Sequence, residues 1–329
     1  MSQVQLKSGK FFKCEEGQLI LDAALEAGIL LEHSCKTGRC GSCRARIISG
    51  KTQSILQENG LSSAEIDAGW ILSCARTPIG SIKIDAEDLS DYPLEKPKTF
   101  PCRISCLEDL SPDVMKVSLR LPPGASFSYR AGQHIDVIAP LGMRRSYSLA
   151  NKASSKGEIE LHIRRVVGGG MSQYWFEQAK SNDLLRINGP KGTFFLRSIE
   201  GLDLIFLATG TGMAPIKAML EDLASNQVFG RPRSIKLFWG GRCIQDLYWD
   251  PVIPDVTFEF RPTLSKADSG WKGSRAYVQD LALMGVDDIS NVSVYACGSS
   301  TMIKSAQSQF LAAGLKSDRF IFDAFVSSS

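Results

Sequence analysis

Hydrophobic and polar positions divide the chain into three segments with different periodicities. In residues 1–90, short apolar stretches predict strands, and Leu21, Ala24, Leu25 and Gly28 recur at helical spacing. Strands are expected at 11–14, 44–48 and 82–84, a helix near 19–27, and a second short helix opened by a capping box at 62–65. Short strands around an amphipathic helix predict a small α+β domain.

Residues 100–197 show alternating stretches separated by turns. Such evenly spaced short strands are typical of an antiparallel β-barrel. The expected strands are 103–107, 114–120, 134–138, 146–149 and 158–164. Residues 91–99, which contain Pro93, Pro97 and mixed charges, are expected to form a linker before this domain.

From residue 198 to residue 329, apolar strands alternate with helices. We expect strands at 204–208, 236–239, 257–260 and 292–296, and helices from 215, at 278–284 and at 302–312. This alternation predicts a doubly wound parallel α/β sheet, whose ligands bind at the carboxyl ends of the strands. The whole chain is therefore expected to be a multidomain α+β protein.

Composition narrows the function classes. The 329 residues are 43% hydrophobic with a net charge of +3, which does not fit the basic stripe of a nucleic-acid binder. Residues 1–13 lack the apolar core of a secretory signal, and no stretch reaches the roughly 18 apolar residues of a membrane span. We expect a soluble cytoplasmic protein. A disulfide framework is not expected, because the cysteines outside the motif below are scattered: Cys14, Cys102, Cys106, Cys243 and Cys297.

Four cysteines follow the C-x4-C-x2-C…C spacing that holds a plant-type [2Fe-2S] cluster. A tight loop supplies three thiolates and a separate segment the fourth, and Gly38 and Gly41 allow the loop to fold closely. Zinc is the alternative, but structural zinc sites usually combine two short C-x2-C turns, and here there is one. The expected ligands are Cys35, Cys40, Cys43 and Cys74.

Glycines at three strand ends of the predicted parallel sheet indicate a dinucleotide crevice. After the first strand, exposed N–H groups at a glycine turn and helix start suit a pyrophosphate, although an ordinary strand–helix turn is the alternative. That run is Gly210-Thr211-Gly212-Met213-Ala214-Pro215, supported by Cys297-Gly298-Ser299-Ser300-Thr301-Met302 and by Trp239-Gly240-Gly241-Arg242.

Two motifs in the barrel segment suit a flavin nucleotide. One combines a cation, an aromatic ring and hydroxyls at a strand end, and the other offers N–H groups and a hydroxyl before a helix. A polar strand edge is the alternative for the first. The motifs are Arg145-Ser146-Tyr147-Ser148 and Gly168-Gly169-Gly170-Met171-Ser172.

The order of these motifs resembles the ferredoxin–flavin–nicotinamide reductases, fused members of the ferredoxin-NADP reductase superfamily. The resemblance covers the whole chain and implies a β-grasp [2Fe-2S] domain at 1–90, an FAD-binding barrel at 100–197 and an NAD(P)H-binding domain at 198–329. Four runs are most similar to the CDP-6-deoxy-Δ3,4-glucoseen reductases of 3,6-dideoxyhexose biosynthesis: 145–151, 189–195, 295–299 and 323–326. Reductase components of oxygenases share most of these motifs.

The resemblance implies a role for each motif. Arg145, Tyr147 and Ser148 would hold FAD, with Ser148 near its reactive nitrogen, and Gly170, Met171 and Ser172 would meet the pyrophosphate. The run His162-Ile163-Arg164 would lie along the flavin nucleotide. Residues 210–215 would cradle the nicotinamide nucleotide, and Cys297 with Gly298 would flank the nicotinamide. Phe325 is a candidate to stack on the flavin, the alternative being a tail aromatic that covers the core.

The implied chemistry takes a hydride from NADH and passes electrons singly through the cluster to an acceptor protein. That acceptor is expected to be an iron–sulfur dehydrase or an oxygenase component. A stand-alone diaphorase or flavin reductase, and a redox-sensing module, are the other classes. NADPH remains an alternative donor, because four residues resemble those that bind its 2′-phosphate in relatives: Ser265, Lys266, Arg275 and Tyr277. Asp246, if it faced the ribose, would instead repel such a phosphate.

Basic residues gather around the cysteine motif and predict an acidic docking face on the acceptor. A mixed, solvated surface is the alternative. The residues are Lys36, Arg39, Arg44, Arg46 and Arg76.

Overall fold

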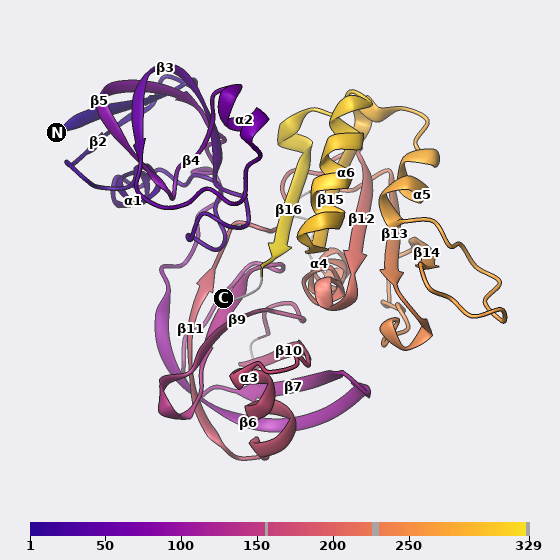
Figure 1. Ribbon diagram of the computed structural model, residues 1–329. Coiled ribbons are helices and arrows are strands. Elements are labelled where there is room, and N and C mark those ends of the chain that lie inside the picture. Colours follow the sequence, from indigo (N-terminus) through magenta and orange to yellow (C-terminus); the bar gives the residue numbers. More distant parts are fainter. Residues whose placement is uncertain (155–156, 226–229, 327–329) are drawn as a thin grey trace. The chain divides into compact units, whose positions relative to one another are not determined.

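The structure, a computed structural model, describes residues 1–154, 157–225 and 230–326 (Figure 1). Its internal contacts divide the chain into two units, one formed by Met1–Leu94 with the segment from Asp323, and the other by Glu95–Phe322. Each unit is described by itself below. Within the described ranges, no helix is long and apolar enough to cross a membrane.

The first unit is built on a five-stranded sheet in the order β2-β1-β5-β3-β4. Strand β1 pairs antiparallel with β2 and parallel with β5. Helix α1 buries its Ile20, Leu21, Ala23 and Ala24 face against a core that includes Leu6, Leu31 and Ile71. The elements are β1 (Ser2–Leu6), β2 (Phe11–Cys14), α1 (Ile20–Glu26), β3 (Arg44–Ser54), α2 (Ser63–Asp67), β4 (Trp70–Leu72) and β5 (Arg76–Asp85).

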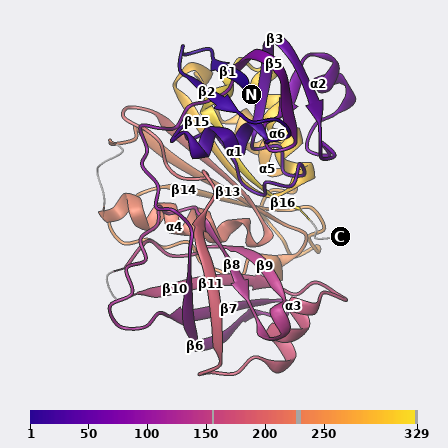
Figure 2. The same ribbon diagram turned by 90° about the vertical axis from the view of Figure 1, so that its left-hand side faces the viewer.

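The second unit begins with a six-stranded antiparallel sheet in the order β10-β7-β6-β11-β8-β9 (Figure 2). A bridge between Leu149 and Leu161 brings its two edges together, which closes the sheet into the expected barrel. Val117, Ile135 and Ile187 are fully buried inside it. The elements are β6 (Lys98–Ser111), β7 (Val114–Arg120), β8 (His134–Ile138), β9 (Arg144–Ser148), β10 (Glu158–Arg164), α3 (Gly170–Gln173) and β11 (Leu184–Lys191).

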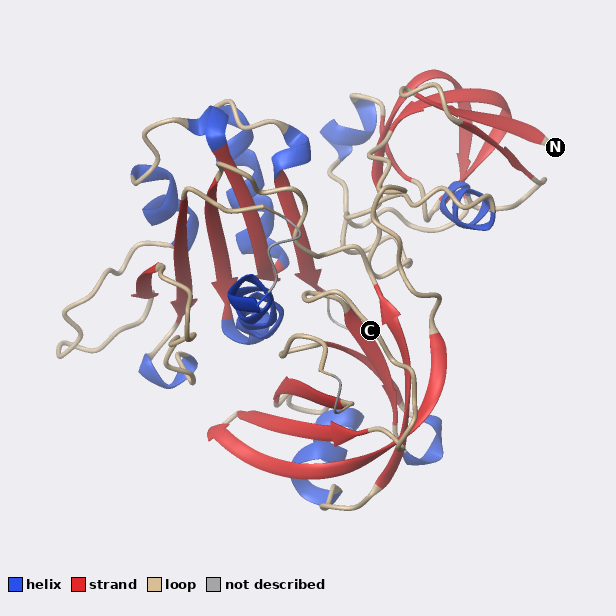
Figure 3. Cartoon of the chain, turned by 180° about the vertical axis from the view of Figure 1, so that it is seen from behind, coloured by secondary structure: helices blue, strands red, loops and turns tan. Residues whose placement is uncertain are grey.

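A second sheet follows, in the order β14-β13-β12-β15-β16, with helices beside it (Figure 3). Strand β12 pairs in parallel with both β13 and β15. Because the strand order reverses between β12 and β15, their carboxyl ends frame the crevice where doubly wound sheets bind ligands. The elements are β12 (Asp203–Thr209), α4 (Met213–Ser225), β13 (Ser234–Gly241), β14 (Glu259–Leu264), α5 (Val278–Met284), β15 (Val292–Ser299), α6 (Ser300–Ala312) and β16 (Phe320–Phe325).

Single-turn helices complete the fold. One of them, η2, is a π-helical turn that continues α3, and η3 contains the glycine run that follows β12. Their bounds are η1 (Pro140–Gly142), η2 (Tyr174–Gln178), η3 (Gly210–Gly212), η4 (Ile244–Asp246), η5 (Ile289–Asn291) and η6 (Ser317–Arg319).

The fold class expected from the hydrophobic pattern is confirmed, and so is the capping box, in which Ser62 and Glu65 bond reciprocally. Four strands escaped the pattern: β1, β4, β11 and β16. Strand β14 was placed wrongly, because it begins at Glu259 instead of residue 257, and β6 already begins at Lys98, inside the expected linker. Pairing with distant strands decided these segments against their local sequence.

Candidate functional site

The four motif cysteines form two close pairs of thiols in the first unit. The Sγ atoms of Cys43 and Cys74 lie 2.9 Å apart. Cys35 Sγ accepts hydrogen bonds from the backbone N–H groups of Thr37 and Cys40, each at 3.4 Å. All four are free thiols, and Cys35 is the most exposed of them. The loop therefore brings together the residues that its spacing predicted.

Glycines allow this loop to lie against a neighbouring backbone. Gly38 has a φ of +74°, and a Cβ there would lie 2.1 Å from the carbonyl oxygen of Gln57. Gly41 has a φ of +82°, and its Cβ would meet the carbonyl of Gly60 at 3.1 Å. Any side chain at Gly38 would push the loop away from residue 57 and change the direction of the thiols.

The electrostatics of the thiols fit a cationic cluster. The hydrogen bond from Cys40 lowers the pKa of Cys35 to about 4, and that from Cys43 lowers the pKa of Cys74. The same contacts, together with burial, raise the pKa of Cys40 and Cys43. Each pair thus holds one negative charge easily, and four thiolates need bound metal. Within the described ranges no three metal-binding side chains converge on one ion, whereas two thiol pairs match two irons.

Ser42 supplies a further sign that this loop surrounds a polar group. The residue lies between Cys40 and Cys43 in the sequence and is 5% exposed, its Oγ atom is buried without a hydrogen bond of good geometry to the described residues, and its side chain acts to lower the pKa of the neighbouring Cys40 thiol. A buried hydroxyl of this kind requires an acceptor. The donor set and this hydroxyl together fit a [2Fe-2S] cluster held by Cys35, Cys40, Cys43 and Cys74.

We expect Ser42→Ala to lower the reduction potential of the cluster, because hydrogen bonds to cluster sulfurs stabilise the reduced, more negative form. The measurement is an electron paramagnetic resonance titration against a series of redox mediators. Ser49→Ala, at an exposed position of β3, is the control and should leave the potential unchanged. A potential for Ser42→Ala equal to that of the parent protein would show that the hydroxyl does not face the cluster.

Ion pairs neutralise much of the basic surface expected near the cluster. Arg76 pairs with Glu58 at 2.7 Å and Arg44 with Glu65 at 2.8 Å. The carboxylate of Glu58 is buried and also accepts the N–H of Leu72 at 2.7 Å, so Arg76 helps to fix β4. These two arginines are therefore structural residues, and the predicted acidic docking face on the acceptor has less positive charge to recognise.

Strand β9 carries the first flavin motif. Burial raises the pKa of Tyr147 to about 12, and its neutral hydroxyl accepts a hydrogen bond from Trp175 Nε1 at 3.0 Å. Ser148 is 9% exposed and ends the strand. Ser146 is committed elsewhere, because its hydroxyl donates to Asp136 at 2.5 Å. Tyr147 and Ser148 alternate along the strand, so they present an aromatic ring and a hydroxyl on opposite sides.

The second flavin motif forms a compact turn into α3. Ser172 Oγ accepts the N–H of Val166 at 2.8 Å, which closes the turn. A Cβ on Gly169 would lie 3.2 Å from the carbonyl of Val166, and one on Gly170 would lie 3.4 Å from Met143. Met171 is buried in the barrel core. The turn is therefore tight at Gly169, whose N–H donates to the carbonyl of Val166 at 3.0 Å, whereas a Cβ on Gly168 would meet nothing within 4 Å.

The crevice between β12 and β15 is formed by backbone in close contact. A Cβ on Gly212 would lie 2.1 Å from the carbonyl oxygen of Cys297. Gly298 has a φ of +139°, and its Cβ would lie 2.1 Å from Thr209 Oγ1, which also accepts the N–H of Ser299 at 3.0 Å. The two predicted glycine runs therefore meet at the strand ends, where the absence of side chains lets the two turns pack against each other.

Several predicted nucleotide-binding side chains belong to the core of this domain. Met213, Trp239 and Cys297 are fully buried in one hydrophobic cluster, and Trp239 Nε1 donates to the carbonyl of Gly210 at 3.1 Å. Met302 is also buried. Their side chains position the loop, and its backbone is the part that remains for a ligand. Other buried members of the predicted set are Ala214 and Pro215.

The side chains of the predicted run at residues 162–164, on β10, alternate between the barrel core and the nucleotide-binding domain. Ile163 is buried in the barrel core, whereas Arg164 forms ion pairs with Asp113, at 2.8 Å, and with Asp246. An Arg164 nitrogen lies 2.7 Å from the position that a Cβ on Gly210 would take, so its guanidinium lies against the glycine loop. Asp246 is buried and forms an ion pair with this arginine. Its carboxylate is therefore engaged within the protein and not directed to a ribose.

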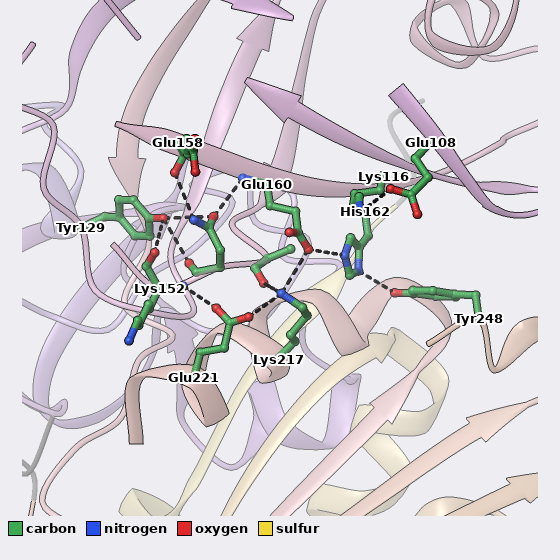
Figure 4. A network of polar contacts seen from close by, with 12 residues as sticks. Glu108, Lys116, Tyr129, Lys152, Glu158, Glu160, His162, Lys217, Glu221 and Tyr248 are labelled. Atoms are coloured by element: carbon green, nitrogen blue, oxygen red, sulfur yellow. Dashed lines mark hydrogen bonds and ion pairs between the residues drawn. The ribbon is translucent and has the colours of Figure 1, made fainter. Parts of the chain in front are cut away.

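His162 lies in a buried polar contact. Its Nε2 atom is 2.8 Å from Glu160 and its Nδ1 atom 3.1 Å from the hydroxyl of Tyr248 (Figure 4). Sequence reasoning missed Glu160 and Tyr248, because nothing in the local pattern distinguishes either from a surface residue. Burial lowers the pKa of His162 below its ordinary value, although the bond to Glu160 opposes this.

When the pH is lowered from about 7 to about 5, we expect the melting temperature of the His162→Gln variant to fall less than that of the parent protein. The unfolded chain takes up the imidazole proton in this range, whereas the folded protein resists it, so His162 removes stability as the pH falls. Glutamine keeps hydrogen-bonding groups without titrating. Differential scanning fluorimetry across the range is the measurement, and parallel curves for the two proteins would contradict the expectation.

Phe325 ends β16 and is 39% exposed. The contacts of the chain assign it to the first unit, so its stacking on a flavin stays a prediction. Ser265 and Lys266 follow β14 and donate backbone N–H groups to Gly241 and Arg242. They therefore lie at the carboxyl edge of the parallel sheet, and a grip on a 2′-phosphate stays a prediction.

Comparison with known proteins agrees with this architecture. Three family models match, described as a 2Fe-2S iron–sulfur cluster binding domain at residues 4–78, an oxidoreductase FAD-binding domain at 101–196 and an oxidoreductase NAD-binding domain at 206–308. The chain is 40% identical to the CDP-6-deoxy-L-threo-D-glycero-4-hexulose-3-dehydrase reductase of Yersinia pestis, over 98% of this chain and 97% of the relative.

One further relative is named for a dioxygenase, and a similar solved structure is named for a cytochrome P450. The chain is 33% identical to reductase component 1 of the terephthalate 1,2-dioxygenase of Comamonas, over 96% of this chain and 95% of the relative. The crystal structure of the Amycolatopsis cytochrome P450 reductase GcoB matches with a TM-score of 0.72 and 27% identity, and each chain is covered completely. The chain therefore belongs to the iron–sulfur flavoprotein reductases, NAD-dependent electron-transfer oxidoreductases that combine a [2Fe-2S] domain, an FAD-binding domain and an NAD-binding domain.

Proposed function

We propose that this reductase delivers electrons from NADH to a dehydrase that acts on a CDP-6-deoxy-hexulose in 3,6-dideoxyhexose biosynthesis. The observation that carries the proposal is the 40% identity with the Yersinia dehydrase reductase over almost the whole of both chains. Identity with the terephthalate dioxygenase component, over a similar length, is 33%. All these relatives are reductases by name, so the difference concerns the acceptor.

The proposed roles of the residues follow from their placement. When bound, FAD accepts a hydride from the nicotinamide and passes electrons singly to the [2Fe-2S] cluster. Arg145, Tyr147 and Ser148 would hold the flavin from β9, and the buried Ser148 hydroxyl would orient its reactive edge. The start of α3, at Gly170, Met171 and Ser172, would receive the flavin pyrophosphate.

The nucleotide side of the site would use mainly backbone. The loop from Gly210 to Gly212 and the turn at Gly298 would bind the nicotinamide nucleotide through N–H groups. Arg164, whose guanidinium lies against Gly210, has its charge paired with Asp113 and Asp246 and would position the loop. Cys297 is fully buried, so its thiol would shape the wall of the pocket and not react.

We propose NADH as the preferred donor. Arg275 uses its guanidinium to donate to the carbonyls of Ala267, at 2.7 Å, and Asp268, at 2.6 Å. These bonds give Arg275 a structural role in the loop after β14. The same guanidinium N–H groups would have to leave these carbonyls in order to bind a 2′-phosphate. Flavin reduction should therefore be faster with NADH than with NADPH at equal concentrations. A faster rate with NADPH would contradict this choice.

The experiment combines the purified holoprotein with two acceptors. One is the CDP-6-deoxy-L-threo-D-glycero-4-hexulose-3-dehydrase of Yersinia with its sugar nucleotide, and the other is the oxygenase of a terephthalate dioxygenase system. NADH oxidation that requires both the dehydrase and its substrate supports the proposal. Turnover with the oxygenase alone would instead assign the oxygenase class, and equal NADH oxidation without either acceptor would indicate a diaphorase.

A further inference from the structure

Three side chains of β10 point to the same side of the strand, because side chains alternate along a strand. Each of them contacts a residue of the nucleotide-binding domain, so this edge of the barrel is a contact strip between the two domains; Figure 4 shows the contacts of Glu160 and His162. The pairs are Glu160 with Lys217 at 3.1 Å, His162 with Tyr248 at 3.1 Å, and Arg164 with Asp246.

Lys217 is the residue of this network with the most contacts to the flavin-binding side. Its Nζ atom contacts Glu160 at 3.1 Å, Glu221 at 2.6 Å and the carbonyl oxygen of Ala150 at 3.1 Å. Its side chain is 12% exposed. An ammonium group has three donors, and here each of them has an acceptor, two of which belong to the barrel.

The segment that Lys217 binds directly follows the flavin motif. Ala150 comes two residues after Ser148, and the N–H of Lys152 donates to Glu221 at 3.0 Å. Lys217 and Glu221 are one turn apart on α4, the helix that begins at the glycine loop. One face of the nucleotide-binding helix is thus attached to the chain that leaves the flavin-binding strand.

The network is polar and paired, and the side chains of Lys217, Glu160 and Glu221 are only 12%, 22% and 25% exposed, which favours one geometry. Burial alone would raise the pKa of Glu160, but the hydrogen bond from His162 and the charge of Lys217 outweigh it and lower that pKa to about 2. Glu160 is therefore ionised at neutral pH. A buried charge pair specifies the position of its partners more sharply than apolar side chains, which can slide over one another.

We propose that Lys217 is a positioning residue for hydride transfer, which ties helix α4 and its nucleotide loop to the flavin-binding segment that follows Ser148. The proposal rests on the proposed function, since it assumes that the barrel binds FAD and the loop binds NADH. In this proposal Lys217 contacts neither cofactor directly. It acts by fixing the distance and angle between the two sites, to which hydride transfer is sensitive.

The test compares Lys217→Met, which keeps the length of the side chain and removes its charge, with Lys304→Met at an exposed position of α6. Anaerobic stopped-flow mixing of the FAD-loaded protein with NADH gives the rate of flavin reduction and the affinity for NADH. We expect the limiting rate to fall at least about ten-fold for Lys217→Met, because small displacements of the reacting groups have effects of this size. The affinity for NADH should stay nearly unchanged, and Lys304→Met should match the parent protein.

Two other readouts separate positioning from a general loss of structure. The long-wavelength absorbance between reduced flavin and nicotinamide should weaken in Lys217→Met, since it depends on the overlap of the two rings. In the FAD-loaded protein without nucleotide, hydrogen exchange of residues 150–152 should become faster, because their attachment to α4 is lost. The FAD content and the flavin reduction potential should not change.

A limiting rate and an absorbance band equal to those of the parent protein would overturn the proposal, as would a loss explained by NADH affinity alone. If Lys217→Met does not fold, Glu221→Gln is the second variant. It weakens the same attachment, whereas the ion pair between Lys217 and Glu160 remains. The same readouts should then change to a smaller extent. No change in Glu221→Gln would then overturn the proposal. Because every measurement uses NADH and flavin without an acceptor protein, a wrong assignment of the acceptor leaves these results unaffected.

Discussion

Replacing Cys74 by serine is expected to remove the [2Fe-2S] cluster and to stop electron delivery to the acceptor protein, while NADH still reduces the flavin. Cys74 lies 2.9 Å from Cys43 and is the one ligand that comes from outside the loop. A hard hydroxyl is a poor ligand for iron in such clusters, which are held by thiolates. Visible absorbance, iron content and dehydrase-coupled NADH oxidation measure the three parts of this result.

Cys106→Ser is the matched control, because Cys106 is an exposed thiol on β6 and lies in the other unit. It should keep its cluster and its full coupled activity. If Cys74→Ser reduced the acceptor at the parental rate, electrons would have to leave from the flavin, and the role assigned to the first unit would be wrong.

The second large effect is expected for Gly212→Ala, which should slow reduction of the flavin roughly ten-fold or more at limiting concentrations of NADH. The added Cβ would lie 2.1 Å from the carbonyl oxygen of Cys297 and 2.8 Å from the backbone nitrogen of Gly298. Both neighbours are backbone, so relief requires that the two nucleotide-binding turns move apart. Overpacking of this kind costs about 1–3 kcal/mol, and a similar loss in nucleotide binding lowers affinity roughly ten-fold or more.

Gly285→Ala is the control for this change. Gly285 follows α5 in the same domain, and a Cβ there would meet its nearest neighbour at an ordinary 3.7 Å. Dithionite should reduce the flavin and the cluster in both variants, which shows that the cofactors are in place. Rapid reduction of Gly212→Ala by NADH would mean that the nucleotide binds away from the crevice between β12 and β15.

The sequence contained most of the candidate site, because the chemistry of these motifs is local. The cysteine spacing fixed which thiols meet, and Gly38, Gly212 and Gly298 mark places where backbone approaches backbone. Strands β7, β8 and β10 were also predicted with their bounds as observed, since each is a short stretch rich in apolar residues with Gly or Pro close to its ends. Local patterns of this kind are readable without knowledge of the partners.

What the sequence did not reveal depends on contacts between distant segments. Strand β11, whose sequence includes Asn188, Gly189 and Pro190, reads as a turn and is a strand only because β6 and β8 pair with it. The contact of Glu160 with Lys217 joins residues from two domains, and each reads as an ordinary surface charge. For the same reason Arg44 and Arg76 suggested a docking surface, whereas their carboxylate partners make them structural.

The most direct test of electron transfer through this chain is an anaerobic titration of the purified holoprotein with NADH, followed by visible absorbance and electron paramagnetic resonance. The account predicts flavin and cluster bands that bleach together, with about three electrons taken up per chain, two by the flavin and one by the cluster. A chain that takes up two electrons and shows no reduced-cluster signal, or that NADH does not bleach, would contradict it.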